Sequence, residues 1–266
     1  RERLKDTFGR FINPEIAAKA ARGELTLGGE TKTATIFFSD IRAFTSISEK
    51  LEAYEVVEFL NDYMTRMVAC VNSNGGVVDK FIGDAVMALW GAPVSSGSAE
   101  QDAKNCIRAA IMMRAALAEF NKGRGGERKP VIRIGCGINT GEVVAGQIGS
   151  HERMEYTVIG DAVNLASRTE SLNKPLCTDI LITEATWHLV RDYVHVERMP
   201  SVSVKGKEEA IRLYAVINIP SETEIPGAGS RGPASLNEVR AMLGLPVPDY
   251  KKVDPDAEER KYTIQS

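Results

Sequence analysis

A short apolar run that ends on a carboxylate constrains the fold of this chain more than any other stretch. Residues 34–38, Ala-Thr-Ile-Phe-Phe, are rich in β-branched and aromatic side chains and predict a buried strand. Asp40 follows the run, and Ser46 and Glu49 then have the spacing of a capping box that opens a helix. This places a carboxylate at a strand end, beside backbone N–H groups that suit phosphate oxygens. The arrangement suits a cation, although many aspartates in such a position only form turns or caps.

The bulk composition is that of an ordinary soluble globular protein. The 266 residues are 43% hydrophobic and 26% charged, with a formal net charge of −3. Because no basic excess is present, nucleic acid is not expected as a partner. The four cysteines are scattered and form no Cys-x-x-Cys pair, which argues against a zinc site or a disulfide framework. No run is long enough for a membrane span, and we expect a cytoplasmic location.

Composition divides the chain into three parts. Residues 1–30 resemble a helical connector, and because the chain opens on Arg1 within a charged pattern, we expect an upstream regulatory region in a longer parent protein. Residues 31–218 carry the regular patterns of one domain. Residues 219–266 are rich in Pro and Gly with few large apolar side chains, which is typical of a tail that is partly disordered. Membrane attachment of the parent protein stays open.

Hydrophobic periodicity predicts the main elements of the central part. Helices are expected at 54–73 and at 100–121, where apolar side chains recur every three or four residues. Two apolar runs flank Gly83 and Asp84, which predicts a β-hairpin with Asp84 at its tip. A strand over 131–138, a turn at 139–141 and a second strand over 142–149 are expected to follow.

A later helix carries two polar side chains at a useful spacing. We expect it to be capped by Asp161 and to run to about Leu172, where residues 173–175, Asn-Lys-Pro, break it. Asn164 and Arg168 are four residues apart and so share one face. An amide and a guanidinium together suit a sugar phosphate, because a guanidinium donates two parallel hydrogen bonds to phosphate oxygens. Taken alone, the pair is explained equally well by an ordinary exposed helix face.

Three blocks in a fixed order give these separate motifs a common interpretation. They are Phe-Phe-Ser-Asp-Ile-Arg-Ala-Phe-Thr at 37–45, Asp-Lys-Phe-Ile-Gly-Asp-Ala at 79–85 and Tyr-Thr-Val-Ile-Gly-Asp-Ala-Val-Asn-Leu-Ala-Ser-Arg at 156–168. Over roughly residues 31–216, the chain resembles the class III adenylate/guanylate cyclase catalytic domain. Asp84 follows Asp40 by 44 residues, which matches the family's spacing between its two metal-binding aspartates.

The resemblance implies both a fold and an assembly. The fold is α/β, of the α+β type, with a ferredoxin-like core whose mixed β-sheet has helices on one side. The assembly is a head-to-tail homodimer with active sites between the chains. One chain would supply Asp40, Asp84 and the backbone carbonyl of Ile41 to two divalent cations, Mg²⁺ or Mn²⁺. The other would supply Asn164 to orient the ribose and Arg168 to stabilise charge on the α-phosphate.

The resemblance also implies which residues hold the substrate. It places Lys205 near the terminal phosphates and adds Phe44 and Thr45 of the first block to the substrate-binding set. In the family, adenine is selected by a Lys paired with Asp or Thr, which correspond here to Lys80 and Thr157. Physically, a Lys donor serves the acceptor N1 of adenine, and the Thr hydroxyl accepts from its amino group.

The sequence therefore predicts an adenylate cyclase, a phosphorus–oxygen lyase that converts ATP into 3′,5′-cyclic AMP and pyrophosphate. Two alternatives stay open at this point. The first is a guanylate cyclase, which in the family carries Glu and Cys at the base-selecting positions. The second is a catalytically silent dimerisation or nucleotide-sensing module. The second alternative is disfavoured because both aspartates, the Asn and the Arg are all present.

Overall fold

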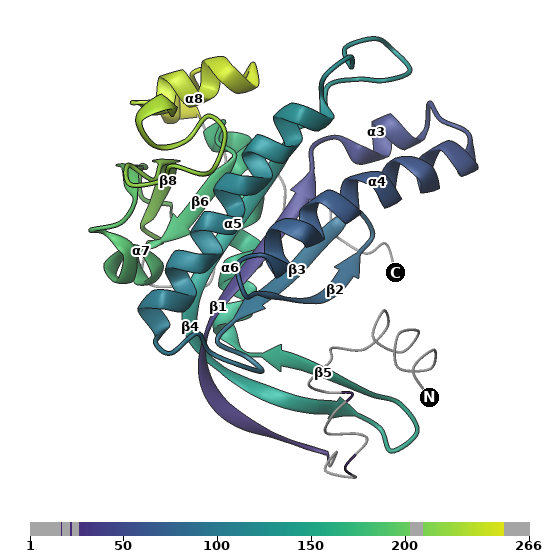
Figure 1. Ribbon diagram of the computed structural model, residues 1–266, viewed down its shortest axis with the longest axis vertical. Coiled ribbons are helices and arrows are strands. Elements are labelled where there is room, and N and C mark those ends of the chain that lie inside the picture. Colours follow the sequence, from purple (N-terminus) through teal and green to yellow (C-terminus); the bar gives the residue numbers. More distant parts are fainter. Residues whose placement is uncertain (1–16, 18–21, 23–26, 203–209, 253–266) are drawn as a thin grey trace.

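One long strand, β1 (Gly28–Ile41), organises the computed structural model, which describes residues 17, 22, 27–202 and 210–252 (Figure 1). β1 pairs antiparallel with β3 on one side and, over all 14 of its residues, with β4 on the other. The strand extends beyond the apolar run at 34–38, because the polar residues before the run pair with the second half of β4. The long strand ends at the candidate carboxylate, Asp40.

The other elements surround β1 in a simple order. After β1 they are α3 (Phe44–Ser48), α4 (Ala53–Asn72), β2 (Val77–Ile82), β3 (Ala85–Trp90), α5 (Ala99–Phe120), β4 (Ile134–Gly149), β5 (Met154–Ile159), α6 (Asp161–Leu176), β6 (Ile180–Thr183), α7 (Glu184–Val190), β7 (His195–Arg198), β8 (Leu213–Asn218), η1 (Gly229–Arg231), α8 (Leu236–Leu243) and η2 (Tyr250–Lys252). Among the described helices, none combines the length and the apolar character that crossing a membrane requires.

The described strands form one mixed sheet of order β2-β3-β1-β4-β6-β8-β7, with β5 paired to β4 outside this path. The chain order β1, α4, β2, β3, α5, β4 combined with the antiparallel strand order β2-β3-β1-β4 is the ferredoxin-like arrangement. β4 and β6 pair in parallel, which makes the sheet mixed. The predicted fold class is confirmed.

Helices cover both faces of the sheet, whereas the sequence predicted helices on one side. α4 and α5 lie side by side across one face, and α6 lies behind the sheet in this view (Figure 1). β1 explains the difference, because its apolar side chains are buried in both directions. Phe37 belongs to the cluster under α4 and α5, whereas Ile36 and Phe38 pack in a cluster that contains Ala166 of α6. A strand that is apolar on both faces needs cover on both.

Three local predictions are corrected by the structure. The turn expected at 139–141 does not form, because β4 is one continuous strand that pairs with β1 from Ile134 to Gln147. Asn139 satisfies its side chain inside the sheet, since its amide donates to the Ala162 carbonyl (2.9 Å) and accepts from the Thr183 hydroxyl (2.6 Å).

The predicted capping box at Ser46 and Glu49 is also absent. α3 instead begins after Ala43, without a side-chain cap.

The third correction concerns α6. Gly160, not Asp161, is its N-cap residue, and the helix continues past Leu172 to Leu176 with Pro175 in its last turn. Asn173, expected to help end the helix, is buried, and its amide donates to the carbonyl of Cys136 on β4 (2.8 Å). A proline in the last turn removes one hydrogen bond of the helix, and contacts with the sheet outweigh that loss.

Residues 219–252 pack against the domain rather than forming a loose tail. Ile219 and Ile225 join the main core, and Leu236 and Val239 join a second cluster with Leu172. The sequence indicated a tail because large apolar residues are sparse there. Ile219, Ile225, Leu236 and Val239 are nevertheless buried, whereas Met242 and Val247 are exposed. Residues 253–266, the rest of the predicted tail, and residues 1–16 of the predicted connector lie outside the described residues.

Candidate active site

The end of β1 and the turn between β2 and β3 bring two carboxylates together. Ser39 pairs with Val86 across β1 and β3, so the β2–β3 turn lies directly beside the end of β1. Gly83 takes a positive φ of 63° at this turn, which is the conformation that glycine tolerates. The backbone N–H of Ile41 donates to Asp40 Oδ1 at 2.9 Å and to Asp84 Oδ2 at 3.0 Å. The two predicted metal-binding aspartates therefore share one donor.

The electrostatics of this pair are unfavourable for two bare carboxylates. The pKa of Asp40 is raised to about 8, chiefly by burial and then by the neighbouring Asp84 and the charge of Glu170, against the lowering effect of the Ile41 N–H. Two carboxylates in contact resist being ionised together, which a divalent cation between them would reverse. The donor set therefore fits an oxygen-preferring cation.

The pair provides part of a coordination shell. In the described part of the chain, no group of three or more His, Cys, Asp or Glu side chains gathers in a way that could hold a metal ion. Mg²⁺ is commonly held by one or two carboxylates, with waters and substrate phosphates completing its octahedron. Asp40 and Asp84 match that pattern, and a cation here would take its other ligands from backbone oxygen, water and substrate.

The predicted base-selecting residues lie close to each other on β2 and β5. Lys80 Nζ is 3.2 Å from Glu155 Oε1, and the Thr157 hydroxyl donates to Asp79 Oδ2 at 2.7 Å. β2 and β5 are not neighbours in the sheet order, so these side chains connect two separate strands. Burial raises the pKa of Asp79, and so does Glu155, whereas the Thr157 hydroxyl and the Lys80 ammonium lower it.

Asn164 lies on the face of α6 that is turned away from the sheet, and Arg168 lies at the edge of that face. The buried residues of this helix are Ala166, Thr169, Leu172, Asn173 and Leu176. At 100° per residue, Asn164 lies roughly opposite them and is exposed, whereas Arg168 lies at the flank of the helix and is half-buried. Glu170 approaches Asp40 closely enough to raise its pKa. Arg168, two residues earlier, lies about 160° from Glu170 around the helix axis.

The remaining predicted substrate residues are less closely tied to the carboxylates. Phe44 is half-buried at the start of α3 and stacks on Phe59 with 6.4 Å between ring centroids. Thr45 is exposed, and its carbonyl accepts from the Ser48 hydroxyl. Phe44 therefore packs with the core in this structure. Lys205 lies outside the described residues.

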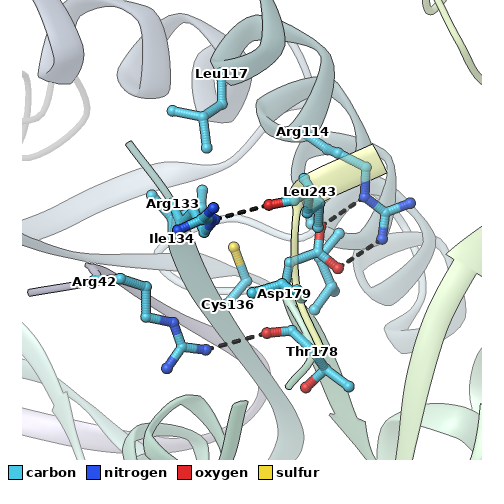
Figure 2. A pocket seen from close by; sticks show the side chains of 12 residues that line it. Arg42, Arg114, Leu117, Arg133, Ile134, Cys136, Thr178, Asp179 and Leu243 are labelled. Carbon is cyan, nitrogen blue, oxygen red and sulfur yellow. Dashed lines mark hydrogen bonds and ion pairs between the residues drawn. The ribbon is translucent and has the colours of Figure 1, made fainter. Parts of the chain in front are cut away.

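A pocket elsewhere in the molecule does not belong to this site. It lies between α5, β4, β6 and the chain after α8, and Arg114 at its wall forms a two-armed ion pair with Asp179 (Figure 2). The same guanidinium also donates to the carbonyls of Val216 and Ile217. Arg133 donates to the Leu243 carbonyl there, at 2.8 Å. These arginines are occupied in joining the strands and the C-terminal segment.

Sequence reasoning missed three acidic residues near the site. Glu170 acts on Asp40 from α6, Glu155 pairs with Lys80, and Asp79 accepts from Thr157. Asp79 was visible beside Lys80 in the second block, but alternation along a strand would put their side chains on opposite faces. The structure shows a β-bulge between Val78 and Lys80 that breaks this alternation. Such an irregularity was not predicted from the sequence.

Comparison of the sequence with known proteins agrees with the fold described above. The family described as "Adenylate and Guanylate cyclase catalytic domain" matches residues 29–218. An adenylate cyclase of Anabaena cylindrica is 42% identical over 226 residues, which cover 79% of this chain and 43% of that protein. Another match covers 10% of an adenylate cyclase of Dictyostelium discoideum, so the chain spans less than half the length of both relatives.

Solved structures show the same likeness. The adenylyl cyclase CyaB of P. aeruginosa is 35% identical with a TM-score of 0.65, and the match covers 76% of this chain and all of that chain. The guanylyl cyclase Cya2 is 37% identical with a TM-score of 0.68, covering 75% of this chain and 98% of that chain. Adenylyl and guanylyl enzymes thus resemble the chain about equally, and the chain belongs to the adenylate and guanylate cyclase catalytic domain family.

Proposed function

We propose that this chain is an adenylate cyclase that converts ATP into 3′,5′-cyclic AMP and pyrophosphate at sites shared between two copies. The observation that carries the proposal is the carboxylate pair of Asp40 and Asp84 around the Ile41 N–H. A nucleotide triphosphate brings a large negative charge, and this pair suits the cations that accompany it. In the reaction the ribose 3′-hydroxyl attacks the α-phosphorus and pyrophosphate leaves.

Asp40, Asp84 and the backbone carbonyl of Ile41 would hold two divalent cations, Mg²⁺ or Mn²⁺. When bound, such ions lower the pKa of the attacking hydroxyl and neutralise charge on the phosphates. The protein contributes by fixing how the Asp40 and Asp84 carboxylates are oriented. The Ile41 N–H holds one oxygen of each carboxylate, which leaves the other oxygens for coordination.

Asn164 and Arg168 would act on the sugar and the α-phosphate. The amide of Asn164 orients the ribose so that its 3′-oxygen faces the phosphorus. The guanidinium of Arg168 donates to the phosphate oxygens as negative charge develops on them. Removing one positioned donor from such a site commonly slows a reaction by about 10²–10³-fold.

Base choice would rest on Lys80 and Thr157. Adenine presents an acceptor at N1 and a donor at its amino group, whereas guanine presents a donor at N1 and an acceptor at O6. An ammonium donor and a hydroxyl acceptor therefore match adenine. Lys80 must leave Glu155 to reach the base. This is a small cost, because the pair is partly exposed and such surface pairs contribute about 0–1 kcal/mol.

The shared site follows from the direction of α6. Around the helix axis Arg168 lies about 160° from Glu170, the α6 residue that approaches Asp40, which supports a nucleotide held between two chains. Each chain carries both sets, and a homodimer would form two such sites. Because the chain spans less than half of its curated relatives, we further infer that other parts of a longer protein regulate this dimer.

The test is a turnover assay of the purified chain with Mg²⁺ or Mn²⁺ and with ATP or GTP in parallel. We expect cyclic AMP as the main product and a specific activity that rises with protein concentration as dimers form. Cyclic GMP as the main product would make the chain a guanylate cyclase instead. No product with either nucleotide, at concentrations where light scattering shows a dimer, would make it a silent module.

A further inference from the structure

Asp79 occupies an irregular position in β2. In the pairing of β2 with β3, Val78 faces Ala88 and Lys80 faces Met87, so the residue between them has no partner across the ladder. A bulge of this kind redirects side chains. Here it lets two consecutive residues of β2 both contact β5, where Asp79 contacts Thr157 and Lys80 contacts Glu155.

The hydrogen bond from Thr157 to Asp79 determines what the hydroxyl can offer a base. A hydroxyl has one proton and two lone pairs, and an ionised carboxylate only accepts. The Thr157 hydroxyl donates its proton to Asp79 Oδ2, with 2.7 Å between the two oxygens. The Thr157 oxygen therefore presents only lone pairs to a ligand. A bond to a charged acceptor is about twice as strong as one between neutral groups. The hydroxyl is therefore held as an acceptor.

No other described donor competes for this carboxylate. The second oxygen, Asp79 Oδ1, is buried, and no described donor bonds to it. Thr157 is itself only 9% exposed, so water is a poor alternative hydrogen-bond partner for its hydroxyl. The nearby charges come from Lys80 on the same strand and Glu155 on β5. Asp79 therefore acts on Thr157 through this one hydrogen bond.

We propose that Asp79 is a positioning residue for base selection, which holds the Thr157 hydroxyl as an acceptor for the amino group of adenine. The inference rests on the proposed function, because it deepens the choice made by Lys80 and Thr157. The O6 of guanine is an acceptor, and it would meet the lone pairs of Thr157. Without Asp79 the hydroxyl rotates freely, donates to O6 and tolerates guanine.

The experiment compares kcat/KM for ATP with kcat/KM for GTP in the wild-type chain and in Asp79→Ala. We expect the ATP-to-GTP ratio to fall about 10-fold to 100-fold in the variant, the range that follows from one misdirected buried hydrogen bond. Asp79→Val, which suits a strand better, should give the same fall if the alanine variant folds poorly. Asp102→Ala is the matched control. It also removes a buried aspartate, which on α5 accepts from Ser95 and Ser96, and it should leave the ratio unchanged.

A second comparison separates positioning from a general structural role. In a Thr157→Val background there is no hydroxyl to hold, so adding Asp79→Ala should not change the ratio further. A ratio that is unchanged in Asp79→Ala and Asp79→Val would overturn the inference and leave the proposed function intact. An equal fall in the Thr157→Val background would overturn it as well. A wild-type chain that prefers GTP would instead overturn the proposed function, and the inference with it.

Discussion

Three aspartates of this chain differ in what surrounds them, and those surroundings decide their roles. Asp179 has both oxygens on the Arg114 guanidinium and is thereby fixed as part of the fold. Asp40 lies against a second carboxylate, and its raised pKa of about 8 follows from burial and that neighbour. Asp79 accepts one hydroxyl from Thr157. The same side chain is therefore part of the fold at Asp179, and we propose cation binding for Asp40 and positioning for Asp79.

Among single residues, Arg168 gives the clearest kinetic test. The substitution Arg168→Ala should slow the reaction without weakening substrate binding greatly. We expect kcat for ATP to fall about 10²–10³-fold with little change in KM, because the guanidinium acts on charge that develops in the transition state. Steady-state kinetics measure this directly. Arg66→Ala is the control, since Arg66 pairs with Asp62 on the surface of α4. A raised KM with unchanged kcat would show that Arg168 only binds the ground state.

Among the elements, β4 and α6 form the contact that places Asn164 and Arg168. Gly137 lies directly beneath α6, where an added Cβ would come 2.1 Å from the backbone nitrogen of Glu170 and 2.6 Å from the carbonyl oxygen of Ala166. Close approach of a helix to a strand requires such glycines. Gly137, which the sequence placed in a strand over 131–138, allows the helix to pack tightly.

Gly137→Ala should therefore destabilise the domain and disturb the site together. We expect a loss of about 1–3 kcal/mol in the free energy of unfolding, the usual cost of overpacking, measured by urea denaturation. Activity with ATP should fall more than stability alone explains, because α6 shifts. Gly126→Ala is the control, since an added Cβ there meets nothing within 4 Å. Equal stability of the two variants would contradict the close contact.

The C-terminal segment is also held by a specific contact. Glu222 accepts from the Arg108 guanidinium of α5 at 2.8 Å and from the backbone N–H groups of Thr223, Glu224 and Ile225. Burial alone would raise the pKa of Glu222, but the backbone N–H of Glu224 and the Arg108 guanidinium outweigh it, so the pKa is lowered.

A lowered pKa gives stability that is present above the unfolded value, about 4.3, and is lost as the pH falls through the folded value. Glu222→Gln should therefore cost about 1.5–3 kcal/mol at neutral pH, the range for hydrogen bonds to charged groups, and progressively less below pH 4. Urea denaturation across pH measures it. Glu224→Gln, which removes an exposed partner of the same Arg108, should cost little at any pH. A pH-independent cost for Glu222→Gln would exclude the charge as its cause.

For the whole molecule, the proposed site has two halves. The carboxylates lie at the end of β1, and Asn164 and Arg168, the residues proposed for the sugar and the phosphate, lie on α6. Because the proposed site draws the two halves from different copies, assembly and activity should be coupled. A weakly dimerising chain would be inactive when dilute while fully folded.

This division predicts complementation between two inactive variants. Asp40→Ala and Arg168→Ala homodimers should each have little activity, whereas a mixture should regain up to about a quarter of the wild-type rate. That fraction follows because half of the random dimers are mixed and each has one intact site. Size-exclusion chromatography with two different tags would confirm that mixed dimers form. Mixed dimers without activity would rule out the shared site.

Much of the architecture was predictable from local patterns. The helices α4 and α5 and the hairpin of β2 and β3 follow from periodicity and from Gly83, within a residue or two. The turn at 139–141 and the helix end near Leu172 were wrong, because glycine, asparagine and proline usually break elements. Here β1 pairs with the backbone of residues 139–141, and the Asn173 side chain on α6 donates to the Cys136 carbonyl of β4. Local propensity does not contain those long-range contacts.

By itself, the sequence determined the order of the elements, the two carboxylates and the polar pair on α6, because these depend on residue types at fixed spacings. Only the tertiary structure decided that Asp40 and Asp84 share the Ile41 N–H and that Asp79 turns toward Thr157. Both contacts join residues more than 40 positions apart in the sequence, and one of them needs a β-bulge. Strand pairing and bulges are set by the whole sheet, and so they become visible only once the chain is folded.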